Sequence, residues 1–133
     1  MDIGFYNKRS LDHFANPRNV GKMDLADGTG LAGDPSCGDY VKVYIKIEGA
    51  LLADIKYEVH GCPAAIATTS AFSELVKGRL LEEAQLIGAR EVEEALGGLP
   101  GDKIHCSCMV VEAFHSAILD WMLADSDELL TNC

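Results

Sequence analysis

Cysteine is the residue type in this sequence best suited to chemistry, and the cysteines are widely spaced. Cys37, Cys62 and Cys106 come from separate segments, while Cys108 and Cys133 complete the set. A cysteine thiolate binds soft metals and attacks sulfur electrophiles. Because no pair has Cys-x-x-Cys spacing, the sequence does not indicate a zinc ribbon, a ferredoxin or a thioredoxin-type redox pair. Ligands drawn singly from separate segments instead suit a metal site that opens.

Two runs of alternating residues predict the hairpin that positions the first two of these cysteines. Residues 41–47 and 55–59 each alternate apolar with polar side chains, which is the period of a half-buried strand. The short connection at Gly49 favours an antiparallel pair. Cys37 precedes the first strand, and Cys62 follows the second.

In such a hairpin, the start of one strand lies beside the end of the other. We therefore expect Cys37, Asp39 and Cys62 to converge at one end of the sheet. Two alternatives stay open at this point. Each cysteine taken singly could be a small buried hydrophobic residue, and Asp39 could merely cap the turn through backbone hydrogen bonds.

Cys62 and Cys106 each lie where a helix is predicted to begin. After the second strand the pattern turns helical, with Pro63 suited to the first helical position and Gly78 to the end. A last helix is expected over residues 107–123, after a glycine-rich loop that could move. Helix N-termini carry partial positive charge and unpaired N–H groups, which favour the thiolate form.

His105 stands beside Cys106 and is a candidate fourth ligand or acid–base group, with an ordinary surface histidine as the open alternative. On a helix, Cys108 would point away from Cys106, and Cys133 is the terminal residue, so both are expected to be bystanders. The remaining histidines are expected at the surface: His13, His60 and His115.

The rest of the pattern completes an α+β domain. We expect a short helix up to Asn16, a glycine-rich loop with one weak strand over residues 21–38, and shorter helices over residues 81–87 and 90–96. Because strands precede most of the helices, the prediction is a small antiparallel β-sheet covered on one face by helices. With 133 residues there is room for one core, so residues 1–133 are expected to form a single domain.

Charge narrows the classes of partner. The chain has 21 acidic and 11 basic residues, a net charge of −10, which disfavours nucleic acids and anionic membranes. No apolar run is expected to span a bilayer, and the start of the chain does not resemble a signal peptide, so reduced thiols in the cytoplasm are expected. No Lys or Arg follows Lys103. The acidic C-terminal segment is either a solvated helix face or a docking surface for a basic partner.

Four motifs follow one another between residues 12 and 120. They are Asp12-His13-Phe14-Ala15-Asn16-Pro17-Arg18-Asn19-Val20-Gly21, Gly33-Asp34-Pro35-Ser36-Cys37-Gly38-Asp39, Gly61-Cys62-Pro63-Ala64-Ala65-Ile66-Ala67 and Lys103-Ile104-His105-Cys106-Ser107. On these residues the chain resembles the NifU/IscU-type scaffold proteins (the NifU N-terminal domain family), on which iron–sulfur clusters are assembled. The resemblance covers nearly the whole chain.

The resemblance implies a role for each matched position. Cys37, Cys62 and Cys106 would be cluster ligands, and Asp39 and His105 would serve as fourth ligand or exchange partner. Cys106 would accept persulfide sulfur. The cargo would be a [2Fe–2S] cluster built from iron, and the same ligand set can hold a zinc ion.

The resemblance also implies partners and a mode of action. They are a cysteine desulfurase that supplies sulfur, ferredoxin or another electron donor, and apo iron–sulfur recipient proteins. The protein would be a scaffold that assembles and transfers clusters, not an enzyme in the turnover sense.

Some features depart from the family or favour rivals. Where the family's chaperone-recognition segment reads Leu-Pro-Pro-Val-Lys, this chain has Leu99-Pro100-Gly101-Asp102-Lys103, which argues against recognition by a dedicated Hsp70-type chaperone. The main alternative is a zinc-bound sulfur acceptor in cluster biogenesis, but the insertion typical of that branch is missing. A thiol redox protein with a reversible Cys37–Cys62 disulfide is the third class, and the absence of Cys-x-x-Cys spacing argues against it.

Overall fold

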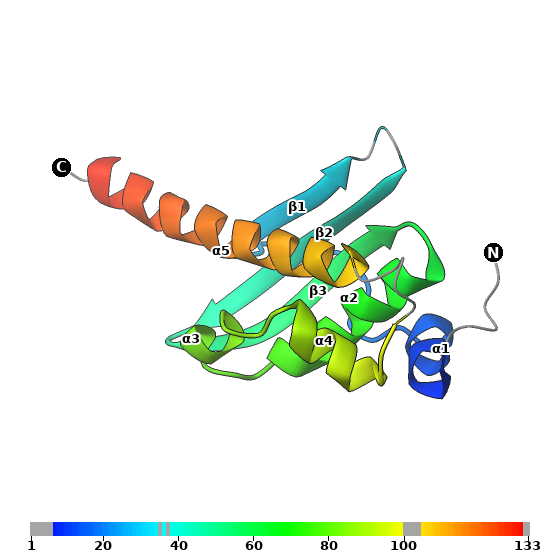
Figure 1. The fold of residues 1–133 in the computed structure, drawn as a ribbon. Coiled ribbons are helices and arrows are strands. Elements are labelled where there is room, and N and C mark those ends of the chain that lie inside the picture. The colour runs from blue at the N-terminus through cyan, green and yellow to red at the C-terminus, as the bar shows by residue number, and fades with distance from the viewer. Residues whose placement is uncertain (1–6, 35, 37, 100–104, 132–133) are drawn as a thin grey trace.

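The computed structural model describes residues 7–34, 36, 38–99 and 105–131, with the side chains of residues 105 and 125–131 left aside. Helices and strands follow the order shown in Figure 1: α1 Lys8–Ala15, β1 Gly28–Asp34, β2 Asp39–Glu48, β3 Leu51–His60, α2 Pro63–Val76, α3 Leu81–Ala84, α4 Ala89–Leu96 and α5 His105–Thr131.

The three strands form one antiparallel sheet in the order β1-β2-β3. The predicted hairpin is β2 and β3, with Val43 opposite Tyr57 and Ile45 opposite Ile55. These four side chains are buried on the face that the helices cover. The predicted α+β architecture, a small antiparallel sheet with helices packed on it, is confirmed.

β1 is the weak strand expected within the glycine-rich segment, and its glycines explain its place in the fold. A Cβ atom on Gly30 would lie 2.1 Å from the carbonyl oxygen of Ala113, and one on Gly28 would lie 2.2 Å from that of Ala117. Only a strand without side chains at these two positions lets α5 approach so closely. The glycines that weaken the strand pattern in the sequence therefore allow α5 to pack closely on β1, the edge strand of the sheet.

α2 packs on β3 and is flanked by α1, α4 and α5. Its apolar side chains are largely buried, with Phe72 packed edge-to-face on Phe114 of α5 at 5.1 Å between ring centres. Thr68, Ser70 and Ser73 are buried as well. α2 is therefore covered on almost every side and not along one apolar stripe alone.

α5 begins two residues earlier and ends eight residues later than the 107–123 expected from the sequence. Figure 1 shows it crossing the sheet and extending beyond it. By length and composition, Cys106–Ala124 could cross a membrane, a stretch that the sequence reading did not pick out. In the structure this stretch packs along β1 and β2 and buries Phe114 and Ala117, as a core helix does.

His13 is not the surface histidine that we expected. Its side chain is only 12% exposed, with Nδ1 at 2.8 Å from Ser70 Oγ and Nε2 at 3.4 Å from Glu74 Oε1. Burial, reinforced by the nearby Arg18 guanidinium, holds the pKa of His13 below its usual value of 6.5. These contacts join α1 to α2 across 57 residues of sequence, so local pattern carries no sign of them.

Candidate functional site

Cys62 occupies the junction between β3 and α2. It is the N-cap residue of α2, with Pro63 following at the start of the helix, as the sequence predicted. Its carbonyl oxygen accepts hydrogen bonds from the backbone N–H of Ala65 at 3.0 Å and of Ile66 at 3.3 Å. The preceding Gly61 has φ +157°, and this turn brings the cysteine to the helix start.

Cys106 lies in the first turn of α5, beside Cys62. The two sulfur atoms are 3.9 Å apart, although the residues are 44 positions apart in sequence. Two helix N-termini, with their partial positive charges, thus meet at one pair of sulfurs. Their approach gives the thiol pair the proximity that a shared metal or sulfur cargo requires.

The Cys106 side chain is held in a small apolar cluster. It is 2% exposed and packs with Ala64 and Ala65 of α2, against the partly buried Met109. The hydroxyl of Thr68 donates to the carbonyl oxygens of Ala65 at 3.1 Å and of Cys106 at 3.4 Å, which ties the start of α5 to α2. Thr68 was not among the residues that the sequence analysis singled out, because its bond is tertiary.

Asp39 opens β2 at the same end of the sheet. A Cβ atom on Gly61 would lie 3.3 Å from Asp39 Oδ1, so the carboxylate sits against the backbone next to Cys62. The carboxylate that caps the preceding turn is Asp34, which accepts from the N–H of Ser36 at 2.9 Å and from its hydroxyl at 2.7 Å. Among the residues described, the Asp39 carboxylate forms no hydrogen bond, which disfavours the turn-cap alternative.

The positions of the two remaining predicted ligands, Cys37 and His105, are not both described. Cys37 lies outside the described residues, and His105 is described only as the first residue of α5. Within the described part of the chain, no group of three His, Cys, Asp or Glu side chains is arranged to hold a metal ion. The five-residue ligand set therefore stays a prediction.

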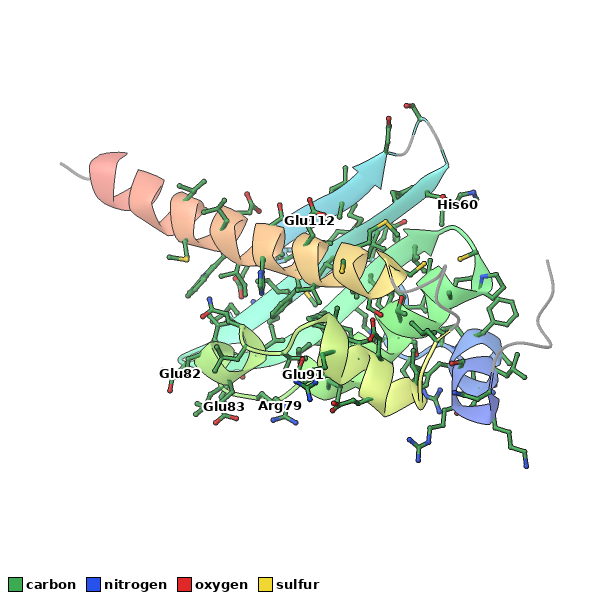
Figure 2. The ribbon with its side chains drawn as sticks, in the orientation of Figure 1. His60, Arg79, Glu82, Glu83, Glu91 and Glu112 are labelled. Carbon is green, nitrogen blue, oxygen red and sulfur yellow. The ribbon has the colours of Figure 1, made fainter. Side chains whose placement is uncertain are left out.

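His60 lies next to this site, which the sequence analysis did not anticipate. Its ring stacks on Tyr40 at 6.1 Å, and a Cβ atom on Gly38 would lie 3.9 Å from His60 Cδ2. It is exposed, as expected. Figure 2 shows it at the end of β3 from which the chain turns toward α2. Matching the alternation of the two predicted strands, with residue 45 opposite residue 55, would have placed residue 60 opposite residue 40, as the structure has it.

The three cysteines that the structure describes differ in access to solvent. Cys106 is buried, Cys62 is half-buried and Cys108 is exposed. The separation of Cys108 from Cys106 on the helix is as predicted. Cys106 lies in the first turn of α5, as a residue at a helix start should, and its side chain is covered. Residues 100–104 of the preceding loop lie outside the described residues, so the expectation that this loop could move stays a prediction. Any reaction at Cys106 requires that cover to open.

The fold and the paired thiols define a class of small α+β proteins with cysteines at two helix starts. The family model for the NifU-like N-terminal domain matches residues 5–126. The chain belongs to this family. The motifs at Cys62 and Cys106 that carried the resemblance thus lie inside the matched region, and the resemblance is confirmed.

Named relatives agree with this assignment. The iron–sulfur cluster assembly scaffold protein IscU 1 of Archaeoglobus fulgidus is 49% identical over 116 residues, which cover 87% of this chain and 76% of the relative. IscU of Escherichia coli strain K12 is 42% identical over 120 residues, covering 87% and 93%. The crystal structure of the N-terminal part of a NifU-like protein from Brucella abortus matches with a TM-score of 0.68 over 90% of this chain and 96% of that one, at 21% identity, and so supports the fold.

Proposed function

We propose that this protein is a cytoplasmic scaffold on which [2Fe–2S] clusters are assembled and from which they pass to apo-proteins. The observation that carries the proposal is the 3.9 Å approach of the Cys62 and Cys106 sulfurs at two helix N-termini. Thiolates are the preferred ligands of iron–sulfur clusters. The relatives named as cluster assembly scaffolds support the same function.

Sulfur would enter on Cys106. Its thiolate would attack the outer sulfur of a persulfide on a cysteine desulfurase, so that the new S–S bond forms on Cys106 and the desulfurase leaves as a thiolate. Ferredoxin or another electron donor would supply the electrons for cluster formation. Since Cys106 is covered by Ala64 and Ala65, this step requires the α5 start to separate from α2.

Release would depend on Asp39. A carboxylate is a harder donor than a thiolate, so it would bind iron less tightly and leave a corner open to an incoming thiolate. Asp39 has no hydrogen bond to break among the residues described, so its carboxylate is available for this role. His105 or water would fill the same corner when Asp39 is replaced.

The test is anaerobic reconstitution with iron, cysteine and a desulfurase, followed by visible absorption. The wild-type protein and Cys108→Ser should develop the charge-transfer bands of a [2Fe–2S] cluster, while Cys37→Ser, Cys62→Ser and Cys106→Ser should not. Asp39→Ala should assemble a cluster and transfer it more slowly to an apo-ferredoxin. Stoichiometric zinc that is indispensable for sulfur uptake would overturn the proposal in favour of a zinc-bound sulfur acceptor.

A metal or cluster should also stabilise the fold, because the cation neutralises thiolates that repel one another. An unchanged melting temperature on addition of stoichiometric zinc at neutral pH would contradict this. Residues 100–104, which include most of the segment that departs from the family's chaperone-recognition motif, lie outside the described part of the chain. Binding to an Hsp70-type chaperone is not part of the proposal.

A further inference from the structure

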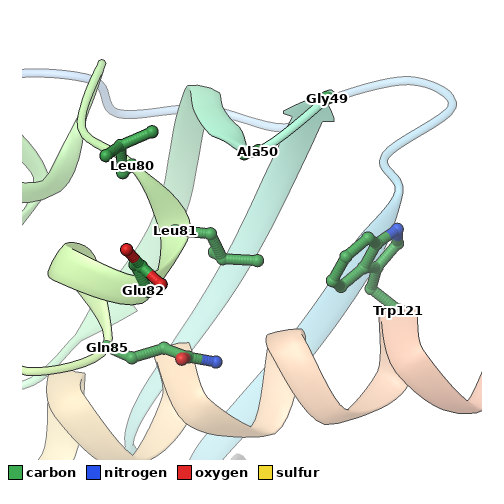
Figure 3. Close-up of a pocket in the computed structure, with 7 residues that line it drawn as sticks. All are labelled: Gly49, Ala50, Leu80, Leu81, Glu82, Gln85 and Trp121. Carbon is green, nitrogen blue, oxygen red and sulfur yellow. The ribbon is translucent and has the colours of Figure 1, made fainter.

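A hollow of about 350 Å³ lies between α3, the β2–β3 turn and α5 (Figure 3). It is lined by Gly49, Ala50, Leu80, Leu81, Glu82, Gln85 and Trp121. Gln85 also lines a smaller hollow of about 140 Å³ with His115 and Ile118 of α5. The two hollows share Gln85 and follow one another along α5, and together we call them the α3–α5 groove.

The α3–α5 groove has an apolar lining with leucines at its edge. Figure 3 shows the Leu81 side chain and the Trp121 ring pointing into the space between α3 and α5. At the edge, Leu51 and Leu80 form an isolated backbone bridge and are 43% and 38% exposed. Neighbouring apolar side chains left open around a concave surface are typical of a protein-binding site.

The charge at this groove is negative. Glu82 lines it, and in the described part of the chain no cation pairs with this carboxylate. The nearest arginine in sequence, Arg79, is engaged by Glu83, with Nη1 and Oε2 3.9 Å apart. None of the residues that line the two hollows is Lys or Arg. The groove thus combines an apolar floor with an unneutralised carboxylate.

We propose that the α3–α5 groove binds a basic amphipathic helix of a partner protein. The apolar face of that helix would lie against Leu81 and Trp121, and a Lys or Arg would meet Glu82, as in other helix-in-groove complexes. A second copy of this chain is a poorer occupant, because pairing through this groove would bring two copies of the same acidic edge together.

This site is remote from the cysteines, so the proposal does not rest on cluster chemistry. The groove includes the turn at Gly49, and Cys62 follows the far end of β3. β3 has 10 residues, so at about 3.4 Å per residue the two ends are about 30 Å apart. A partner bound in the groove would leave the Cys62 end accessible to other proteins.

The single tryptophan of the chain, Trp121, makes the groove directly observable. The probe is a helical peptide of about 14 residues, roughly four turns, built from Lys and Leu and free of aromatic residues. We expect a saturable change in Trp121 emission that weakens as salt is raised. A peptide of the same length built from Glu and Leu should produce none.

Two variants and a matched control locate the binding. Glu82→Arg should weaken the affinity about five- to tenfold, and Ala50→Arg, at the exposed turn, should block the groove. Glu94→Arg on α4 makes the same change of charge away from the groove and should bind as the wild type does. The melting temperature of each variant shows whether it is folded.

Three outcomes would overturn the proposal. Equal affinity of Glu82→Arg and Glu94→Arg would mean that the peptide recognises only net charge. Saturable binding of the Glu–Leu peptide would assign the groove to an acidic partner. Self-association in sedimentation that Ala50→Arg abolishes would assign it to a second copy.

Discussion

The two halves of α2 are held in different ways. In the half that begins at Ser70, which we call the Ser70 half, the Ser70 hydroxyl lies within hydrogen-bonding distance of the His13 ring. It also accepts from the backbone N–H of Arg18 at 3.0 Å, and Phe72 packs on Phe114. In the half that begins at Pro63, which we call the Cys62 half after its N-cap residue, the helix packs through alanines against Cys106. Thr68 bonds to α5 at 3.4 Å, and the Cys62 sulfur lies 3.9 Å from that of Cys106.

This difference separates stability from chemistry along one helix. The Ser70 half carries the large aromatic contact and the polar bonds to α1, so it should decide whether the chain folds. The Cys62 half has mostly small side chains, and it meets α5 through two long contacts, the 3.4 Å bond of Thr68 and the 3.9 Å approach of the Cys62 and Cys106 sulfurs. Opening the contact around Cys106 should therefore cost little, which is what the proposed entry of sulfur requires.

The largest effect expected is on the free energy of unfolding. Phe72→Ala should lower it by about 3–5 kcal/mol, because a fully buried ring leaves a cavity against Phe114. Ile66→Ala, at a half-buried position in the Cys62 half, should cost markedly less. Urea unfolding of both variants measures the two losses in free energy, and unchanged m-values would show that the variants unfold as the wild type does. Equal losses would mean that the two halves of α2 do not differ as described.

A smaller, pH-dependent effect is expected from His13. Its pKa is lowered in the folded protein, so the unfolded chain takes up the proton first as pH falls below about 6.5. The contribution of His13 to the free energy of unfolding should therefore be constant above that pH and decline below it. The facing groups are Arg18, which opposes protonation, and Glu74 and Asp12, which favour it.

The measurement is the free energy of unfolding between pH 7.5 and about 5, taken with His13→Gln and His115→Gln. The decline should be shallower in His13→Gln and unchanged in His115→Gln, whose side chain is exposed. A decline of the same steepness in all three proteins would place the titrating group elsewhere.

Local pattern predicted the elements whose signals do not depend on distant contacts. The alternation in β2 and β3 and the proline and glycine around α2 were sufficient, and with them came the convergence of Asp39 and Cys62. β1 was weak in sequence because Gly28 and Gly30 serve a close approach to α5. A local pattern cannot show a contact with residues more than 80 positions away.

The same limit explains one error in the fold and one omission at the candidate site. His13 was expected at the surface because nothing near it in sequence indicates Ser70, and Thr68 was missed because its partner is Cys106. The resemblance supplied candidate ligands, and the fold supplied the distance between two of them. Neither supplies the order in which the thiols react.

That order is the next prediction, and it concerns rates rather than stability. In metal-free protein, alkylation should modify Cys108 first, Cys62 next and Cys106 last, following their burial. Cys106 should react more than tenfold more slowly than Cys108, since it must first leave the cluster with Ala64 and Ala65. Peptide mapping after short pulses of iodoacetamide gives the order. Early modification of Cys106 would show that the Cys62 half is already open.

The smallest effect should come from one hydroxyl, and a neighbouring threonine provides its control. Thr68→Val removes the bond to the Cys106 carbonyl, so alkylation of Cys106 should become a few times faster, with a loss of about 1 kcal/mol in unfolding free energy. Thr69 is equally buried and also donates to Ala65, at 2.7 Å, but has no bond to Cys106. Thr69→Val should therefore cost a similar free energy of unfolding and leave the rate of Cys106 alkylation unchanged. Thr68→Ser, which keeps the hydroxyl, should show the wild-type rate. If both valine variants speed the reaction equally, the rate follows overall stability, and the Thr68 bond does not hold the start of α5 closed.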